Sequence, residues 1–311
     1  MAVLVSVSLA CSRIALAATV VSTIPVGAGP VHIALSPTTS RAYVTNRDSD
    51  SVSVIDTNAH AVITTVSVQS APVGIAVRPD DSEVWVVNRL SGTLTIINAV
   101  SLTMVATINV GGLPDAIVFS HDGSRAYVTN DTSFAVAIVD VISRSIIGSI
   151  PTPGFVGESL LITPDDRIGY LAEDQPDGPI LRTEVLDLSS GSVIGEIEDT
   201  WLTAFSHRGP TAWGFQPVTN TVSLVHLNRP EVRTTVSVSP RPISLVLSTD
   251  GKRLYVASDL SNEITILNAI SGKLLETLSV GGRPTDIVVL PSGTLAYVAQ
   301  LDAGSVAILS L

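Results

Sequence analysis

The sequence predicts an all-β fold made of seven similar units, and three observations carry this prediction. The tetrapeptide Tyr43-Val44-Thr45-Asn46 recurs unchanged at residues 127–130. Degraded copies place an aromatic residue at steps of 42 or 43 residues, at positions 43, 85, 127, 170, 213, 255 and 297. Each unit holds four short runs rich in Val, Ile, Thr or Tyr, without sustained helical periodicity. We therefore expect a seven-bladed β-propeller of four-stranded antiparallel blades.

The first element along the chain is a leader, which we place at residues 1–18. Residues 2–11 are apolar, and Ala15-Leu16-Ala17 is an Ala-x-Ala cleavage pattern. The start lacks a basic residue and Arg13 interrupts the apolar stretch, so an uncleaved extension stays an alternative. A lipoprotein anchored through Cys11 is a third interpretation, because residues 8–11 partly resemble a lipobox. A cleaved leader predicts a secreted or periplasmic protein.

Residues 19–311 are expected to form a single propeller domain that the N-terminal strand closes. Val20–Val26 matches the fourth strand of the other units, whereas Ser305–Leu311 matches the third strand of the last one. Placing Val20–Val26 on the edge of blade seven removes an open strand edge. If its four apolar side chains are mostly buried there, the strand contributes about 4–8 kcal/mol before entropy.

Units four and five depart from the regular repeat. Gly157 and Thr200 replace the prolines that begin the other units, and Trp201 stands before the first strand of unit five. An acidic insertion, residues 173–179, lengthens unit four. Function is often added where an array departs from its repeat, and drift of a tolerant surface loop explains the same departures equally well.

The repeat carries a family resemblance. A Gly-x-Pro entry, a hairpin like Ser-Pro-Asp-Gly, the Tyr-Val-Thr-Asn strand and a Val-x-Val-Ile-Asp-Thr strand stand in unit one as Gly29-Pro30, Ser36-Pro37, Tyr43–Asn46 and Val52–Thr57. This pattern resembles the YVTN family of β-propeller repeats from about residue 20 to residue 311. The resemblance implies the seven-bladed fold. It leaves function open, because relatives of this kind include surface-layer proteins, periplasmic binding modules and lactonase-like enzymes.

Composition narrows the choice of partners. The net charge is −11 and the 17 Lys and Arg residues are scattered, which argues against binding to nucleic acid. The single cysteine, Cys11, allows neither an intrachain disulfide nor a zinc site built from cysteines. The apolar stretch of the leader is too short and too interrupted to span a membrane. We expect a monomer.

Polar loop residues are expected to gather at one end of the ring. Because successive strands alternate in direction, the loops that enter each blade and the loops after the Tyr-Val-Thr-Asn strands share that end, which we call the channel mouth. The polar residues offered there are His32, Arg47, Asp48, Asp50, Arg89, Asp115, Asp131, Glu158, Glu173, Arg241, Arg283 and Asp286. Charged loop residues are, taken singly, usually just solvated.

From the mouth we select nine residues as the ligand site. We expect the site to centre between blades three and five, where a large aromatic stands beside carboxylates. The nine residues are His32, Arg47, Asp115, Glu158, Glu173, Trp201, Arg241, Arg283 and Asp286.

No metal and no cofactor is expected, and catalytic residues stay unassigned. The five histidines fall at different repeat positions without chelating spacing. His32 could in principle join Asp115, Glu158 and Asp286 in a carboxylate site of the kind that lactonase-type propellers hold, but no family motif matches these residues. There is also no Gly-x-Ser-x-Gly nucleophile motif.

The preferred function is an extracytoplasmic binding or scaffold module that recognises a protein, peptide, glycan or small polar ligand at the channel mouth. The alternative is an enzyme, a lactonase-like hydrolase or a cyclase, that uses mouth carboxylates. A third hypothesis is that the protein is a structural component of the cell envelope. Acids converging within about 2.0–2.6 Å of one ion would favour the enzyme, and splayed charges would favour binding.

Overall fold

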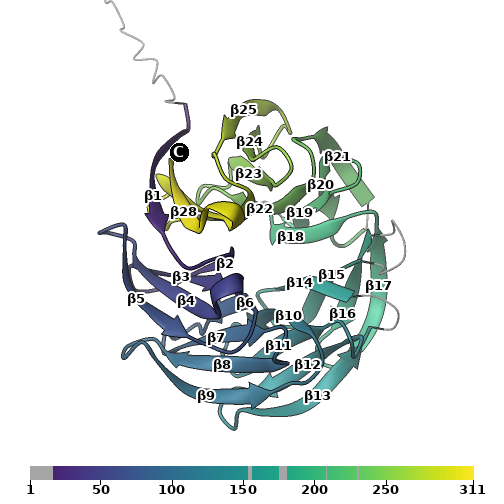
Figure 1. Ribbon diagram of the computed structural model, residues 1–311. Helices are drawn as coiled ribbons and strands as arrows, with labels where there is room; N and C mark the ends of the chain where they lie inside the picture. The colour runs from purple at the N-terminus through teal and green to yellow at the C-terminus, as the bar shows by residue number, and fades with distance from the viewer. Residues whose placement is uncertain (1–16, 153–155, 175–180, 208, 230) are drawn as a thin grey trace, which may run out of the picture.

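The computed structural model is a ring of seven four-stranded antiparallel sheets, which confirms the predicted propeller (Figure 1). It describes residues 17–152, 156–174, 181–207, 209–229 and 231–311. The leader through residue 16, with Cys11, lies outside the described residues, as does most of the acidic insertion. None of the described residues forms a helix that is long and apolar enough to cross a membrane.

Each of the first six blades uses four strands that are consecutive in the chain, and blade seven takes its fourth strand from the N-terminus. Blades one to three are β2 (Pro30–Leu35), β3 (Arg41–Asn46), β4 (Ser51–Asp56) and β5 (Ala61–Ser67); β6 (Pro72–Val77), β7 (Glu83–Asn88), β8 (Thr93–Asn98) and β9 (Thr103–Asn109); and β10 (Pro114–Phe119), β11 (Arg125–Asn130), β12 (Ala135–Asp140) and β13 (Ser145–Pro151). Blades four and five are β14 (Val156–Ile162), β15 (Ile168–Asp174), β16 (Leu181–Asp187) and β17 (Ser192–Glu198); and β18 (Trp201–Phe205), β19 (Thr211–Gln216), β20 (Thr221–His226) and β21 (Glu231–Ser237). Blades six and seven are β22 (Pro242–Leu247), β23 (Arg253–Ser258), β24 (Glu263–Asn268) and β25 (Leu274–Ser279); and β26 (Pro284–Val289), β27 (Leu295–Gln300), β28 (Ser305–Ser310) and β1 (Thr19–Pro25).

The core lies between blades, because each sheet has two apolar faces and must bury both. The aromatic residue of the repeat lies on the second strand of each blade and is buried in all seven blades. These residues are Tyr43, Trp85, Tyr127, Tyr170, Trp213, Tyr255 and Tyr297. One core cluster joins Trp85 of blade two to Phe119 of blade three, with the two rings edge to face at 5.4 Å. Another joins blade seven to blade one through Tyr297 and Ile33. Burial of these faces therefore depends on neighbours on both sides.

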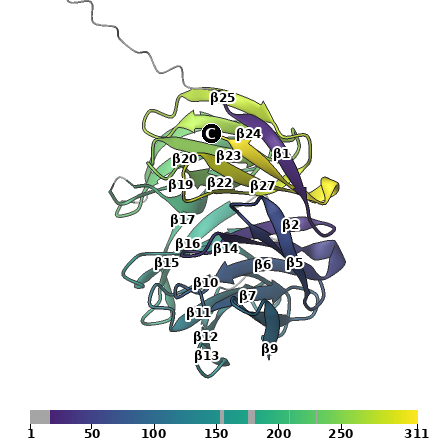
Figure 2. The same ribbon diagram turned by 90° about the vertical axis from the view of Figure 1, so that its left-hand side faces the viewer.

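The ring closes as predicted. β1 pairs antiparallel with β28, from Thr19 opposite Ser310 to Pro25 opposite Ser305. β1 is therefore the outermost strand of blade seven, and Figure 2 shows it at the edge of the sheet. The condition for the estimate of about 4–8 kcal/mol, that the apolar side chains of this strand are mostly buried, is not met, because an outer strand has solvent on one side: Ile24 is 4% exposed, whereas Val21 is 60% exposed.

Side chains add bonds across the same junction between blades seven and one. The Thr285 hydroxyl donates to the Pro30 carbonyl at 3.0 Å, and the amide of Ile33 donates to Asp286 at 2.9 Å. Nδ1 of His60 lies 2.7 Å from the Tyr297 hydroxyl. Polar contacts and an apolar cluster thus share the closure with the β1–β28 pairing.

The closure can be tested with two substitutions in one strand. Ile24→Ala should lower the free energy of unfolding by about 2–3 kcal/mol, because it empties part of a buried cluster. Val21→Ala, on the exposed side of the strand, should change it by less than about 0.5 kcal/mol. Urea unfolding measures both. Equal effects of the two substitutions would show that β1 is not packed as described.

Candidate functional site

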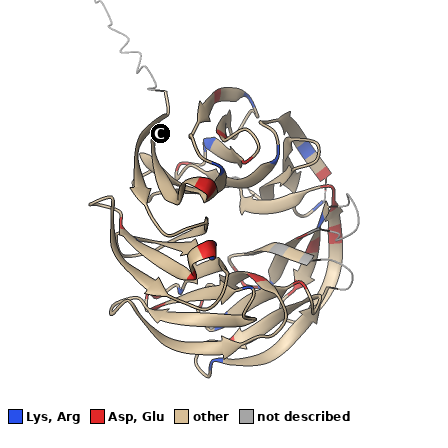
Figure 3. Ribbon diagram, viewed as in Figure 1, with Lys and Arg blue, Asp and Glu red and all other residues tan. Residues whose placement is uncertain are grey.

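The two predicted sets of loops meet at the mouth. Backbone bonds join them in blade after blade: Arg47 N donates to Gly29 O at 2.8 Å, and Arg89 N to Ala71 O at 2.9 Å. Two short 3-10 turns, η1 (Arg47–Ser49) and η2 (Leu301–Ala303), lie in these loops. Figure 3 shows that charged positions are scattered over an otherwise uncharged ribbon. Two groups of charged side chains nevertheless cluster at the mouth.

One cluster lies where the innermost strands of blades one, six and seven start. Nδ1 of His32 is 3.6 Å from Oδ2 of Asp286, and the Ser244 hydroxyl donates to Oδ1 of the same carboxylate at 2.8 Å. Bulges shift the register of β2 after Pro30 and of β26 after Pro284, and a bulge re-aims side chains in this way. Burial acts to raise the pKa of Asp286, but His32, Ile33 and Ser244 outweigh it and hold the pKa below its usual range.

The cluster continues through Asp115 toward blade two. Arg89 pairs with Asp115 and with Asp131, so one guanidinium bridges two carboxylates of blade three. Burial raises the pKa of Asp115 although Arg89 and His32 act against it. His32 therefore lies in the field of two carboxylates, those of Asp286 and Asp115.

A second cluster joins blades six and seven, with the opposite charge balance. Nε of Arg241 donates to Asp259 at 2.6 Å, and Nη2 of Arg283 lies 3.2 Å from Oδ2 of the same carboxylate. Asp259 is 4% exposed, whereas Arg241 and Arg283 are 42% and 39% exposed. Burial alone would raise the pKa of Asp259, and the two guanidinium groups lower it below the ordinary value.

A hollow of about 580 Å³ lies beside this second cluster, between blades seven and one. Arg283 and Arg47 line it together with the acidic residues Asp48 and Asp302. Arg47 pairs with its neighbour Asp48 at 2.8 Å, and both side chains are exposed. Such an exposed pair is weak, which leaves the Arg47 guanidinium able to exchange partners.

Glu173 lies inside the sheet and not at the mouth surface. Its side chain is completely buried, and Arg182 donates to it at 3.2 Å. Arg182 also pairs with Glu184, which is itself nearly buried. The equivalent positions in blade one are Asn46, Ser51 and Ser53, joined by neutral hydrogen bonds of 3.0–3.1 Å. Blade four thus replaces a neutral polar network with a charged one.

This network has fewer donors than acceptors. Oε1 of Glu173 and Oε2 of Glu184 are buried without a hydrogen-bond partner. Burial, with repulsion from Glu184 second, raises the pKa of Glu173 to about 8 despite Arg182. Burial likewise raises the pKa of Glu184. The arrangement therefore favours a proton on this pair at neutral pH.

Trp201 is half-buried and packs against the apolar cluster shared by blades five and six. Its ring lies edge to face with Phe215 at 5.5 Å, and its indole N–H donates to the Glu173 carbonyl at 2.7 Å. Glu158 belongs to β14, but its side chain lies outside the described part of the structure.

The structure thus separates the nine selected residues. It gathers His32, Asp115 and Asp286 into one cluster and Arg241 and Arg283 into the other, and it places Arg47 with Arg283 at the hollow. Among the described residues no group of three His, Cys, Asp or Glu is arranged to hold a metal ion. Sequence reasoning did not single out Ser244 or Asp259, although Asp259 directly follows the motif copy at 255–258, as Arg89 and Asp131 follow theirs.

Comparison with known proteins agrees with the fold. Residues 8–145, less than half of the chain, match the family model described as "Lactonase, 7-bladed beta-propeller". A search of curated proteins finds no match. Hydrazine synthase of Kuenenia stuttgartiensis is similar in structure, with a TM-score of 0.83 and 20% identity over 91% of this chain and 96% of that one. The Cps50 (Swd1) β-propeller domain of Myceliophteria thermophila has a TM-score of 0.81 and 9% identity over 95% and 100%. At these identities the two structures support the fold alone.

The buried carboxylates of blade four predict a pH-dependent stability. The pKa of Glu173 is raised from 4.5 to about 8, so the protonated form favours the folded state. The contribution of the raised Glu173 pKa to the free energy of unfolding is fully present below pH 4.5 and is lost as the pH rises toward 8. Glu173→Gln should remove this loss, so that the stability of the variant relative to wild type rises between pH 5 and 8.

Urea unfolding at several pH values measures the effect. Glu231→Gln, at an exposed position of β21, is the control and should keep the wild-type pH slope. A Glu173→Gln variant with the wild-type slope would show that Glu173 does not exchange a proton on unfolding.

Proposed function

We propose that this protein is an extracytoplasmic binding module whose channel mouth recognises a small polar ligand that carries negative charge. The observation that carries the proposal is the hollow of about 580 Å³ lined by Arg47 and Arg283. It is large enough for a ligand of roughly sugar size, and its position at the mouth is where propeller loops from different blades converge.

The charge balance beside the hollow supports an anion. One carboxylate, Asp259, serves two guanidinium groups, so the cluster keeps an excess of one positive charge. Each guanidinium has five N–H donors in a planar fork that suits carboxylate or phosphate oxygens. Arg241 and Arg283 are both accessible to such a ligand. Asp48 and Asp302 add acceptors, which favours a ligand that also bears hydroxyl groups.

An enzyme that hydrolyses a lactone is the second candidate, and the family match over residues 8–145 favours it. His32 is the group best placed to accept a proton from an attacking water, because Asp286 lies 3.6 Å from its Nδ1 and can orient the ring. His32 is also 44% exposed, so a substrate at the mouth could reach it.

The binding proposal is tested with gluconate, a small hydroxylated acid, and with glucose as its neutral counterpart. Calorimetric titration should detect gluconate and not glucose. Arg283→Gln should weaken gluconate binding about tenfold, because a charge-assisted hydrogen bond to the acid is lost. Arg125→Gln, at an exposed position at the start of β11, is the control and should leave the affinity unchanged. Equal binding by all three proteins, or no gluconate binding, would contradict the proposal.

The enzyme candidate is tested with gluconolactone. Acid release above the spontaneous rate, followed in a pH-stat, should fall at least about tenfold in His32→Gln if His32 is the general base. Turnover at the spontaneous rate in wild-type protein would leave only the binding function.

A further inference from the structure

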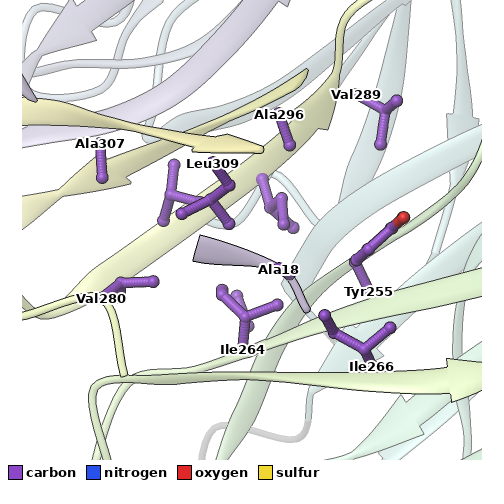
Figure 4. Close-up of a cluster of buried hydrophobic side chains, with 12 residues drawn as sticks. Ala18, Tyr255, Ile264, Ile266, Val280, Val289, Ala296, Ala307 and Leu309 are labelled. Carbon is purple, nitrogen blue, oxygen red and sulfur yellow. The ribbon is translucent and has the colours of Figure 1, made fainter. Parts of the chain in front are cut away.

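The chain enters the folded domain between Ala17 and Ala18. Ala17 is exposed, whereas Ala18 is 3% exposed and belongs to an apolar cluster between blades six and seven. Figure 4 shows Ala18 among Ile264, Ile266 and Leu309. The fold therefore holds in place the residue that directly follows the Ala15-Leu16-Ala17 pattern.

A carboxylate faces the backbone nitrogen at this entry point. The nitrogen of Ala18 donates to Oε2 of Glu276 at 3.0 Å. Glu276 lies on β25, the outer strand of blade six, 258 residues away in the sequence. Among the described residues Glu276 forms no ion pair with a Lys, Arg or His side chain. In the part of the chain that the structure describes, the partner of this partly buried carboxylate is thus a neutral amide.

We propose that the Ala17–Ala18 peptide bond is a processing site and that Glu276 is the counter-ion of the α-ammonium group that cleavage creates. The step is a hydrolysis by a signal peptidase of the exporting cell. Water gives its hydroxyl to the Ala17 carbonyl carbon and a hydrogen to the Ala18 nitrogen. Ala17 leaves with the leader as a carboxylate, and the Ala18 amine takes up a proton. This inference rests on the export part of the proposed function and not on the mouth.

Cleavage converts an existing contact into a stronger one. The intact chain offers Glu276 one neutral N–H, whereas the processed chain offers an ammonium group at the same atom. A hydrogen bond between two ionised groups is about twice as strong as one between neutral groups. β1 pairs with β28 of blade seven, and the contact with Glu276 adds a polar link from the chain end to blade six, beside the apolar packing of Ala18.

The small residues on both sides of the bond fit this role. A leader peptidase needs a small residue before the cleaved bond, and Ala17 provides it. Ala18 provides a small side chain for the closed cluster on the other side. The cleavage pattern and the packed entry point thus coincide at one bond, although one comes from the sequence and the other from the structure.

The processing site is tested by expressing the full chain in a secreting bacterial host and sequencing the N-terminus of the exported protein. The expected first residue is Ala18. Ala17→Leu should block or displace cleavage, because it removes the small residue before the bond. Exported protein that begins elsewhere, or full-length protein with none exported, would overturn the assignment.

The counter-ion role is tested on two purified forms. One begins at Ala18 after removal of a tag that leaves no extra residue, and the other keeps Ala17 behind a Gly-Ser extension. Glu276→Gln should lower the Tm of the first form by about 2–4 °C more than that of the second. Glu231→Gln, on the outer strand of blade five, should act equally on both forms. Equal Tm losses for Glu276→Gln in the two forms would refute the pairing. Gluconate binding should be unchanged by this substitution, so it tests the proposed ligand site at the mouth independently.

Discussion

The structure depends on one constraint, which is that a four-stranded blade has two apolar faces and cannot bury either of them alone. Each core cluster is accordingly shared between blades that are neighbours in the ring, as with Trp85 and Phe119. An open array would leave two such faces in water. The ring must therefore close, and the pairing of β1 with β28 completes the last sheet. Burial of Ile24 and Ile33 in the cluster that also holds Tyr297 shows that closure is a matter of packing as much as of strand pairing.

Closure also decides where polar chemistry can occur. Side chains on the faces between neighbouring blades are committed to packing, so the polar groups of the mouth come from loops and from the first residues of the innermost strands. At the mouth, carboxylates and guanidinium groups from different blades compensate one another. The compensation is unequal: Arg89 bridges two carboxylates, while Asp259 serves two arginines. The mouth thus carries an excess of negative charge at blades two and three and an excess of positive charge at blades six and seven.

Most of the fold could be predicted from the sequence, because the repeat gives seven independent readings of one pattern. The blade count and the closing strand follow from the aromatic spacing and from the match of the N-terminal segment to fourth strands. The burial of β1 could not be predicted in the same way, because apolar composition alone does not separate the two faces of an outer strand. Val21 and Ile24 are both aliphatic, and only the register places one in solvent.

The candidate site was less predictable, and Glu173 shows why. Repeat position gives the end of the ring at which a residue lies, but not whether its side chain points to solvent. The final residue of the motif is buried in all seven blades, from Asn46 to Gln300, and Glu173 occupies this position in blade four. The exchange of Asn for Glu is accompanied by Arg and Glu in place of the two serines that Asn46 contacts. At these residues the irregularity of blade four is thus a change inside the sheet, where charged side chains replace neutral hydrogen-bonding ones. A departure from the repeat can reach a ligand only where its side chain is exposed, and at the mouth the side chains of Arg241 and Arg283 are exposed.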